Sequence, residues 1–206
     1  MKKLILACVF ILGVFISFSQ QSVIFFASDS VLISGDLYMT KDKEAPFILL
    51  FHQAFFSRGE YIDIAPKLNA MGYNCLAIDQ RFGKEVNKIK NKTSKNAKKK
   101  GVKKMPKDTY PDLEAALGYV KRNYKPKQLI VWGSSYSASL SLVLASKHKE
   151  IDALLLFSPG EYFKYENKHF CEWAKTVDCP VFMTSSQKEA KKRTIIFNTI
   201  LIVICV

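Results

Sequence analysis

Apolar residues along this chain gather in short runs that are separated by segments of helical period. Runs of strand length recur at seven places: residues 23–26, 31–39, 46–52, 73–79, 128–132, 151–157 and 180–184. The run at 46–52 is continuously apolar, which is typical of a strand covered on both faces, while 31–39 alternates like the edge strand of a hairpin. Strands that alternate with helices predict an α/β fold, with a mostly parallel central sheet and helices on both faces.

Helical patterns lie between several of these runs. The segment that begins at Pro111 has one apolar face, and residues 136–147 follow a predicted strand directly. Ser57 and Glu60 have the spacing of a capping box ahead of a further helix, which Pro66 is expected to kink or split.

The two ends of the chain differ from the part between them. Residues 1–19 start with two lysines, continue in an apolar run and finish in small residues, so they predict a signal peptide and export to the periplasm or the medium. The run is shorter than the ~20 residues of a bilayer span, and no stable membrane span is expected. Residues 20–192 predict one globular domain. The apolar tail, residues 193–206, is interpreted as a truncated or frame-shifted ending, with a native final strand and a membrane tail as the alternatives.

The net charge of +13 has a local source. Residues 84–107 hold eleven lysines without helical or strand periodicity, which predicts a long surface loop. This Lys-rich loop is either a solvated insertion or the binding surface of a non-catalytic exported protein for anionic polymers such as acidic polysaccharide, nucleic acid or lipid headgroups. It contains no aromatic residue between Lys84 and Lys104 on which bases could stack, so no specific nucleic-acid partner is expected.

Two further observations limit the chemistry. Cys171 and Cys179 are close enough in sequence to allow a disulfide in an oxidising compartment. The chain shows neither metal-ligand spacing nor a phosphate-binding glycine loop, so we expect no metal and no cofactor.

A serine motif follows the predicted strand 128–132. In Gly133-Ser134-Ser135-Tyr136-Ser137, small residues flank Ser135 where a strand turns into a helix, a pattern that predicts a nucleophile elbow. Tyr136 then offers its backbone N–H to an oxyanion, and Ser137 replaces the second glycine of the usual pattern. The alternative is a helix N-terminus at which Ser134 or Ser135 serves only as a cap.

Three segments resemble dienelactone-hydrolase-like members of the α/β-hydrolase superfamily: LLFHQAFFSRGEY at 49–61, LAIDQR at 76–81 and VWGSSYSAS at 131–139. The resemblance covers roughly residues 22–190. It implies an α/β-hydrolase fold and a serine hydrolase that acts on a carboxylic ester or lactone-like bond of a small molecule. It also implies that the backbone N–H of Gln53 or Ala54 is the second oxyanion donor, although Phe55 stands where a glycine is common.

The resemblance implies a catalytic acid as well, and Glu189 is the best candidate; the alternative is that Glu189 is a solvated charge among lysines. A triad in this fold runs Ser, acid, His, and no histidine follows Glu189 in this sequence. The three histidines are His52, His148 and His169, the last in a segment at 160–178 that is expected to cap the pocket. We therefore expect a hydrolase fold without the usual last strand and helix, and catalysis that is impaired for want of the histidine.

Overall fold

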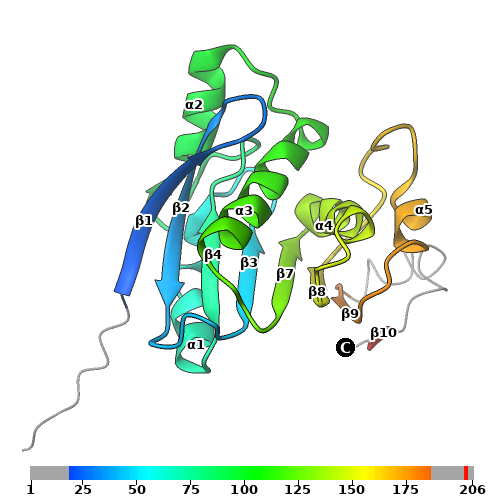
Figure 1. Ribbon diagram of the computed structural model, residues 1–206. Coiled ribbons are helices and arrows are strands. Elements are labelled where there is room, and N and C mark those ends of the chain that lie inside the picture. Colours follow the sequence, from blue (N-terminus) through cyan, green and yellow to red (C-terminus); the bar gives the residue numbers. More distant parts are fainter. Residues whose placement is uncertain (1–18, 187–201, 204–206) are drawn as a thin grey trace, which may run out of the picture.

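The computed structural model describes residues 19–186 and 202–203, and it is built around an eight-stranded sheet (Figure 1). The strands follow one another in the spatial order β1 (Ser19–Phe26), β2 (Leu32–Met39), β4 (Asn74–Ile78), β3 (Phe47–Phe51), β7 (Leu129–Ser134), β8 (Ala153–Phe157), β9 (Val181–Thr184) and β10 (Ile202–Val203). β1 pairs antiparallel with β2, and β2 antiparallel with β4; every other neighbouring pair is parallel. The seven predicted strands and the mostly parallel sheet are thus confirmed.

The central strand β3 shows why helices cover both faces of the sheet. Its side chains alternate, as in any strand: Phe47, Leu49 and Phe51 face one core, and Ile48 and Leu50 face the other. The first core is shared with α3 (Tyr110–Asn123), α4 (Tyr136–Lys147) and α5 (Phe170–Ala174), and the second with α1 (Ala65–Ala70). All five β3 side chains are almost completely buried, as the unbroken apolar run predicted.

The Lys-rich segment is not the loop that its sequence predicted. It contains a short hairpin of β5 (Glu85–Val86) and β6 (Ile89–Lys90), then the helix α2 (Lys92–Lys100), and it is followed by the 3-10 turn η2 (Pro106–Thr109). Asn91 caps the start of α2 by accepting a hydrogen bond from the Ser94 N–H at 2.7 Å. Gly101 ends it with φ 72°, a conformation that favours glycine. The face buried against β2 consists of small residues, which give no apolar periodicity, and the helix was missed for that reason.

We expect Asn91→Ala to lower the free energy of unfolding by roughly 1–2 kcal/mol. The side chain is buried; besides capping α2, its Nδ2 donates to the carbonyl oxygen of Gln80 at 2.8 Å. Urea unfolding would measure the change, with Asn123→Ala on the exposed end of α3 as the matched control. Equal stabilities of the two variants would contradict this account of how α2 is held.

Several smaller expectations have clear outcomes. Pro66 does split the helix after Ser57, into the 3-10 turn η1 (Arg58–Tyr61) and α1. Cys171 and Cys179 are free, so the disulfide that their spacing allowed is not formed.

Residues 1–18 of the predicted signal peptide and most of the tail lie outside the described residues, so export and the origin of the tail stay predictions. Of the tail, Ile202 and Val203 are described, and they pair in parallel with β9. In the part of the chain that is described, no helix is long and apolar enough to cross a membrane.

Candidate active site

The chain turns sharply at Ser135 between β7 and α4. Ser135 has φ 57° and ψ −122°, a backbone conformation that is strained for a residue with a side chain. Its backbone N–H donates to the carbonyl oxygen of Phe157 in β8 at 2.7 Å, which fixes the turn at the carboxyl end of the sheet. The Ser135 side chain makes no cap hydrogen bond to α4, so a purely capping role for this residue does not match the structure.

The residues on either side allow the strand and the helix to approach closely. A Cβ atom at Gly133 would lie only 2.5 Å from the Cα of Ala138, so this position has no room for a side chain. Ser137, in place of the second glycine, accepts a hydrogen bond from the Ser134 N–H at 2.9 Å, and its Oγ lies 2.8 Å from the carbonyl oxygen of Phe51. The serine at 137 is therefore accommodated, and it ties the elbow to the end of β3.

The expected oxyanion donors come from the start of α4 and from the loop after β3. Tyr136 is the first residue of α4, and no hydrogen bond among residues 19–186 occupies its N–H. The Gln53 N–H donates to Oε2 of Glu60 at 2.8 Å, so this donor is engaged. None of the described residues accepts from the Ala54 N–H. Tyr136 and Ala54 are thus the two candidate donors that remain available.

Phe55 explains why glycine is common at its position. The residue has φ 64°, in the left-handed region that favours glycine. Its ring packs against Phe82 with centroids 4.8 Å apart, and its N–H donates to the Phe82 carbonyl oxygen at 3.4 Å. These contacts hold the loop in shape in spite of the substitution.

Glu60 belongs to the site, although the sequence indicated only a capping box. Ser57 does cap η1, accepting from the Gly59 N–H at 3.1 Å, but the Glu60 carboxylate points to Gln53 and to the hydroxyl of Ser134. Burial raises the pKa of Glu60, and the hydrogen bonds from these two groups oppose the rise. Glu60 thus joins the loop after β3 to Ser134, the residue before Ser135, a role for which the spacing in sequence gave no signal.

A tyrosine of the segment 160–178 is the hydrogen-bond partner of Ser135. The Ser135 Oγ lies 3.3 Å from the hydroxyl of Tyr162, which donates to the carbonyl oxygen of Ser158 at 2.8 Å. The Tyr162 oxygen therefore accepts a hydrogen bond from the Ser135 hydroxyl. Other cap aromatics pack instead: Tyr165 lies against Tyr110, with ring centroids 5.0 Å apart.

No histidine among the described residues is hydrogen-bonded to Ser135. The ring of His52 is fully buried, and its Nε2 accepts from the Gln80 N–H at 2.9 Å, so its Nδ1 carries the proton and donates to the Gln53 carbonyl oxygen at 2.7 Å. Burial lowers the pKa of His52 to about 4. Both ring nitrogens are used, so His52 shapes the loop and cannot also take a proton from Ser135.

The other two histidines each lie beside a glutamate. Nε2 of His148 is 3.4 Å from Glu114 Oε1, and Nδ1 of His169, at the start of α5, is 3.3 Å from Glu161 Oε2. Glu189 falls outside the described residues, so its role as the acid stays a prediction. Among the described residues, no cluster of His, Cys, Asp or Glu could hold a metal ion.

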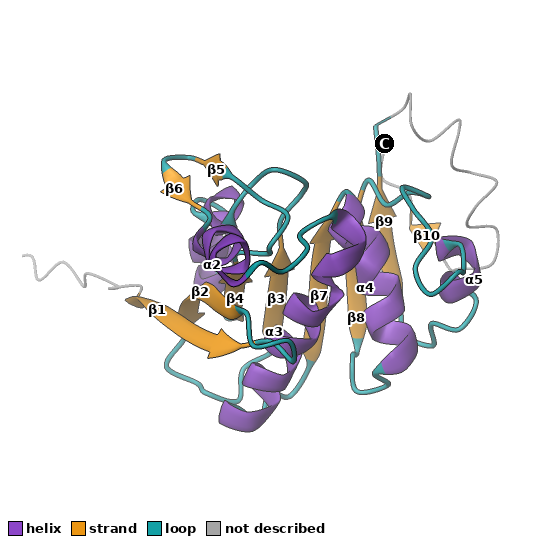
Figure 2. Ribbon diagram, turned by 90° about the horizontal axis from the view of Figure 1, so that it is seen from above, coloured by secondary structure: helices purple, strands orange, loops and turns teal. Residues whose placement is uncertain are grey.

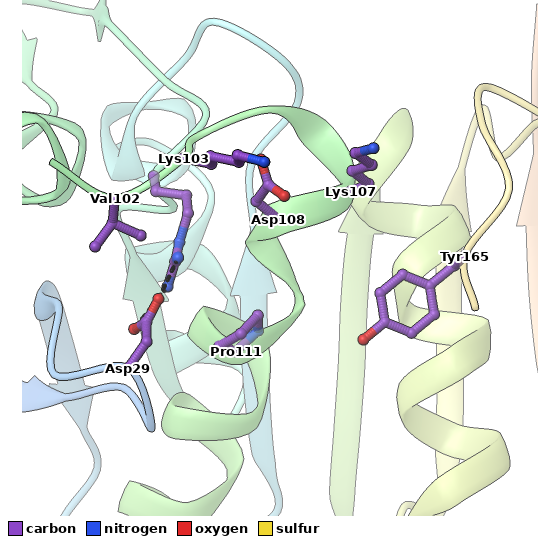
Figure 3. A pocket seen from close by; sticks show the side chains of 8 residues that line it. Asp29, Val102, Lys103, Lys107, Asp108, Pro111 and Tyr165 are labelled. Atoms are coloured by element: carbon purple, nitrogen blue, oxygen red, sulfur yellow. Dashed lines mark hydrogen bonds and ion pairs between the residues drawn. The ribbon is translucent and has the colours of Figure 1, made fainter. Parts of the chain in front are cut away.

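A cavity of about 380 Å³ lies beside Arg81, at the start of α3 (Figure 3). Its lining mixes charges of both signs: Asp29, Arg81, Val102, Lys103, Lys107, Asp108, Pro111 and Tyr165. The Arg81 guanidinium is already paired with Asp29 and with Asp112, at 2.6 Å each. Ser135 does not line this cavity, which is therefore separate from the candidate catalytic centre.

The mostly parallel sheet and the strained serine at a strand-to-helix turn define an α/β-hydrolase. The chain belongs to the serine aminopeptidase S33 family, whose model matches residues 42–197. No curated protein matches the chain.

Solved structures agree on the fold. An esterase of Pyrococcus furiosus has a TM-score of 0.64 at 19% identity, with 91% of this chain and 81% of that one covered. A protein of Klebsiella pneumoniae assigned to the dienelactone hydrolases has a TM-score of 0.64 at 16% identity, with 91% and 86% covered. Est1E of Butyrivibrio proteoclasticus has a TM-score of 0.63 at 12% identity, with 89% and 88% covered. The predicted α/β-hydrolase fold is confirmed.

Proposed function

We propose that this protein is a serine hydrolase that attacks the carbonyl carbon of a small carboxylic ester or lactone-like substrate through Ser135. The observation that carries the proposal is the strained backbone at Ser135, which presents a hydroxyl at the carboxyl end of β7 without using it as a helix cap. Such strain persists only where the surrounding structure enforces it, and it is concentrated at functional sites.

The reaction follows from the groups around this serine. As the Ser135 Oγ bonds to the carbonyl carbon, the carbonyl oxygen becomes an oxyanion, which in this proposal the N–H groups of Tyr136 and Ala54 stabilise. In a complete triad a histidine oriented by an acid, here Glu189, takes the serine proton. Among the described residues, the hydrogen-bond partner of the Ser135 hydroxyl is Tyr162 and not a histidine. We therefore propose that catalysis is impaired, by a loss on the order of a million-fold in turnover relative to an intact triad.

Reaction with a fluorophosphonate probe tests the nucleophile. We expect slow labelling of Ser135 in the folded chain, identified by peptide mapping, and faster labelling when imidazole is added, because imidazole supplies the missing base. Ser135→Ala should remove the label, and Ser146→Ala, a half-exposed serine of the same helix, should keep it. Labelling that survives Ser135→Ala would refute the assignment of the nucleophile. Labelling unaffected by imidazole would refute the proposal that the chain lacks a catalytic base.

The alternative function is non-catalytic binding of anionic polymers through residues 84–107. The observation in its favour is that the segment is ordered as a helix whose exposed positions carry lysines, and not as a solvated loop. A folded chain that never labels at Ser135, with or without imidazole, and that elutes from heparin only at high salt would favour this function over hydrolysis.

A further inference from the structure

The exposed side of α2 is strongly basic. Its exposed residues are Lys92, Lys95, Lys98, Lys99 and Lys100. None of these lysines forms an ion pair with any residue of the described chain, and Glu85 is the single acidic residue between positions 84 and 107. The positive potential of this helix is therefore directed at the solvent.

Two exposed apolar side chains lie beside this helix. Ile24 and Phe26 on β1 are each 66% exposed, and they pair with Ser34 and Leu32 of β2. Side chains of α2 hydrogen-bond to the backbone of the same two β2 residues, at 3.0 and 2.9 Å. Figures 1 and 2 both show α2 next to the β1–β2 hairpin. Basic and apolar groups thus meet at one edge of the molecule, which we call the basic-apolar surface.

This surface lies at the catalytic end of the sheet. In Figure 1, α2 stands at the end towards which β3 and β7 point, while α1 lies at the opposite end. Two more exposed apolar residues belong to the same region: Met105 is 58% exposed, and Phe55, which is 53% exposed, has the Lys84 ammonium 5.3 Å above its ring. A partner bound here would lie at the same end of the sheet as the turn at Ser135.

We propose that the basic-apolar surface binds an anionic phospholipid bilayer. Lysines attract acidic headgroups, and exposed aliphatic and aromatic side chains beside them enter the boundary between headgroups and acyl chains. A single-stranded nucleic acid would instead use aromatic residues interleaved with the lysines, and no aromatic residue lies between Lys84 and Lys104. The proposal does not depend on activity at Ser135; it specifies the partner of the lysine-rich segment.

Vesicle sedimentation tests this proposal with two matched triple variants of the full chain. One, Lys95→Gln with Lys98→Gln and Lys99→Gln, removes three charges from α2. The other, Lys41→Gln with Lys43→Gln and Lys67→Gln, removes three exposed charges at the opposite end of the sheet. Because glutamine is about as good a helix former as lysine, α2 should stay folded, which circular dichroism would check.

We expect the unaltered chain to sediment with vesicles of phosphatidylcholine and phosphatidylglycerol more strongly than with phosphatidylcholine alone, and salt to weaken the difference. The α2 variant should lose on the order of a hundredfold in affinity for the acidic vesicles, and the control only a few-fold. Ile24→Thr with Phe26→Thr should reduce the binding that remains at high salt.

Three results would overturn the proposal: equal losses in the two triple variants, no preference for acidic vesicles, or retention on heparin that depends on α2 without any vesicle binding. The last result would identify a soluble polyanion as the partner. Fluorophosphonate labelling of the same variants is expected to match that of the unaltered chain, so failure of the bilayer proposal and failure of the hydrolase proposal can be told apart.

Discussion

Replacing Arg81 with methionine is expected to lower the free energy of unfolding by about 3–5 kcal/mol. The Arg81 side chain is 2% exposed, and it pairs with Asp112, which is completely buried, and with Asp29. Burial raises the pKa of Asp112 to about 6, against the opposing effect of the Arg81 guanidinium. Without the guanidinium, Asp112 would be a buried carboxylate with no positive partner. Chemical unfolding monitored by fluorescence would give the change.

Two further variants separate the contribution of the Arg81–Asp112 ion pair to stability from the effect of losing a large side chain. Arg122→Met removes an exposed arginine from the same helix as Asp112 and should change stability by less than 1 kcal/mol. Adding Asp112→Asn to Arg81→Met should recover part of the loss, because it removes the unpaired charge. A loss that is unchanged by Asp112→Asn would show that packing, and not charge, dominates at Arg81. The result bears on the site, because the neighbouring Gln80 contacts both His52 and the Tyr136 hydroxyl.

Stability is expected to fall as the pH drops from about 6.5 to about 4, with His52 responsible for about 3 kcal/mol of the fall. The pKa of His52 is lowered to about 4 by burial, from an ordinary value of 6.5. The unfolded chain therefore binds the proton first as the pH falls, and the native state loses stability across this window. Above 6.5 the imidazole is neutral in both states, so its contribution is fully present and constant there.

The matched comparison is His52→Gln, whose amide oxygen can still accept from the Gln80 N–H. Its free energy of unfolding should depend less on pH between 4 and 6.5, and the difference between the two curves isolates the histidine from carboxyl groups such as Glu60. Parallel curves for the unaltered chain and His52→Gln would show that His52 is not held neutral by burial.

The sheet could be predicted from the sequence because a strand buried on both faces has a local signature. The run Phe47–Phe51 is apolar at every position, and both of its faces are covered by helices. The elbow could be predicted for a related reason. Where the strand turns directly into the helix, position 133 has no room for a side chain and Ser135 adopts a strained backbone conformation. Both constraints involve residues only a few positions apart, so they leave a local motif in the sequence.

The helix α2 and the surroundings of Ser135 could not be predicted in this way. Thr93 is buried in α2 with its hydroxyl accepting from the Ser34 N–H near the start of β2, a long-range contact that no local pattern records. Glu60 and Tyr162 come from separate segments and meet the elbow only when the loop after β3 and the cap fold over it.

Short-range sterics and alternation of apolar residues therefore determined the strands, the turn at Ser135 and the class of fold from the sequence by itself. Tertiary structure decided which N–H of the loop after β3 stays available, which group accepts the hydrogen bond of Ser135, and where the lysines of α2 are presented. The physical reason is that these are contacts between residues 7 to 59 positions apart in sequence, such as Gln53 with Glu60 and Ser34 with Thr93. Burial and hydrogen bonding of this kind are fixed only when the elements pack.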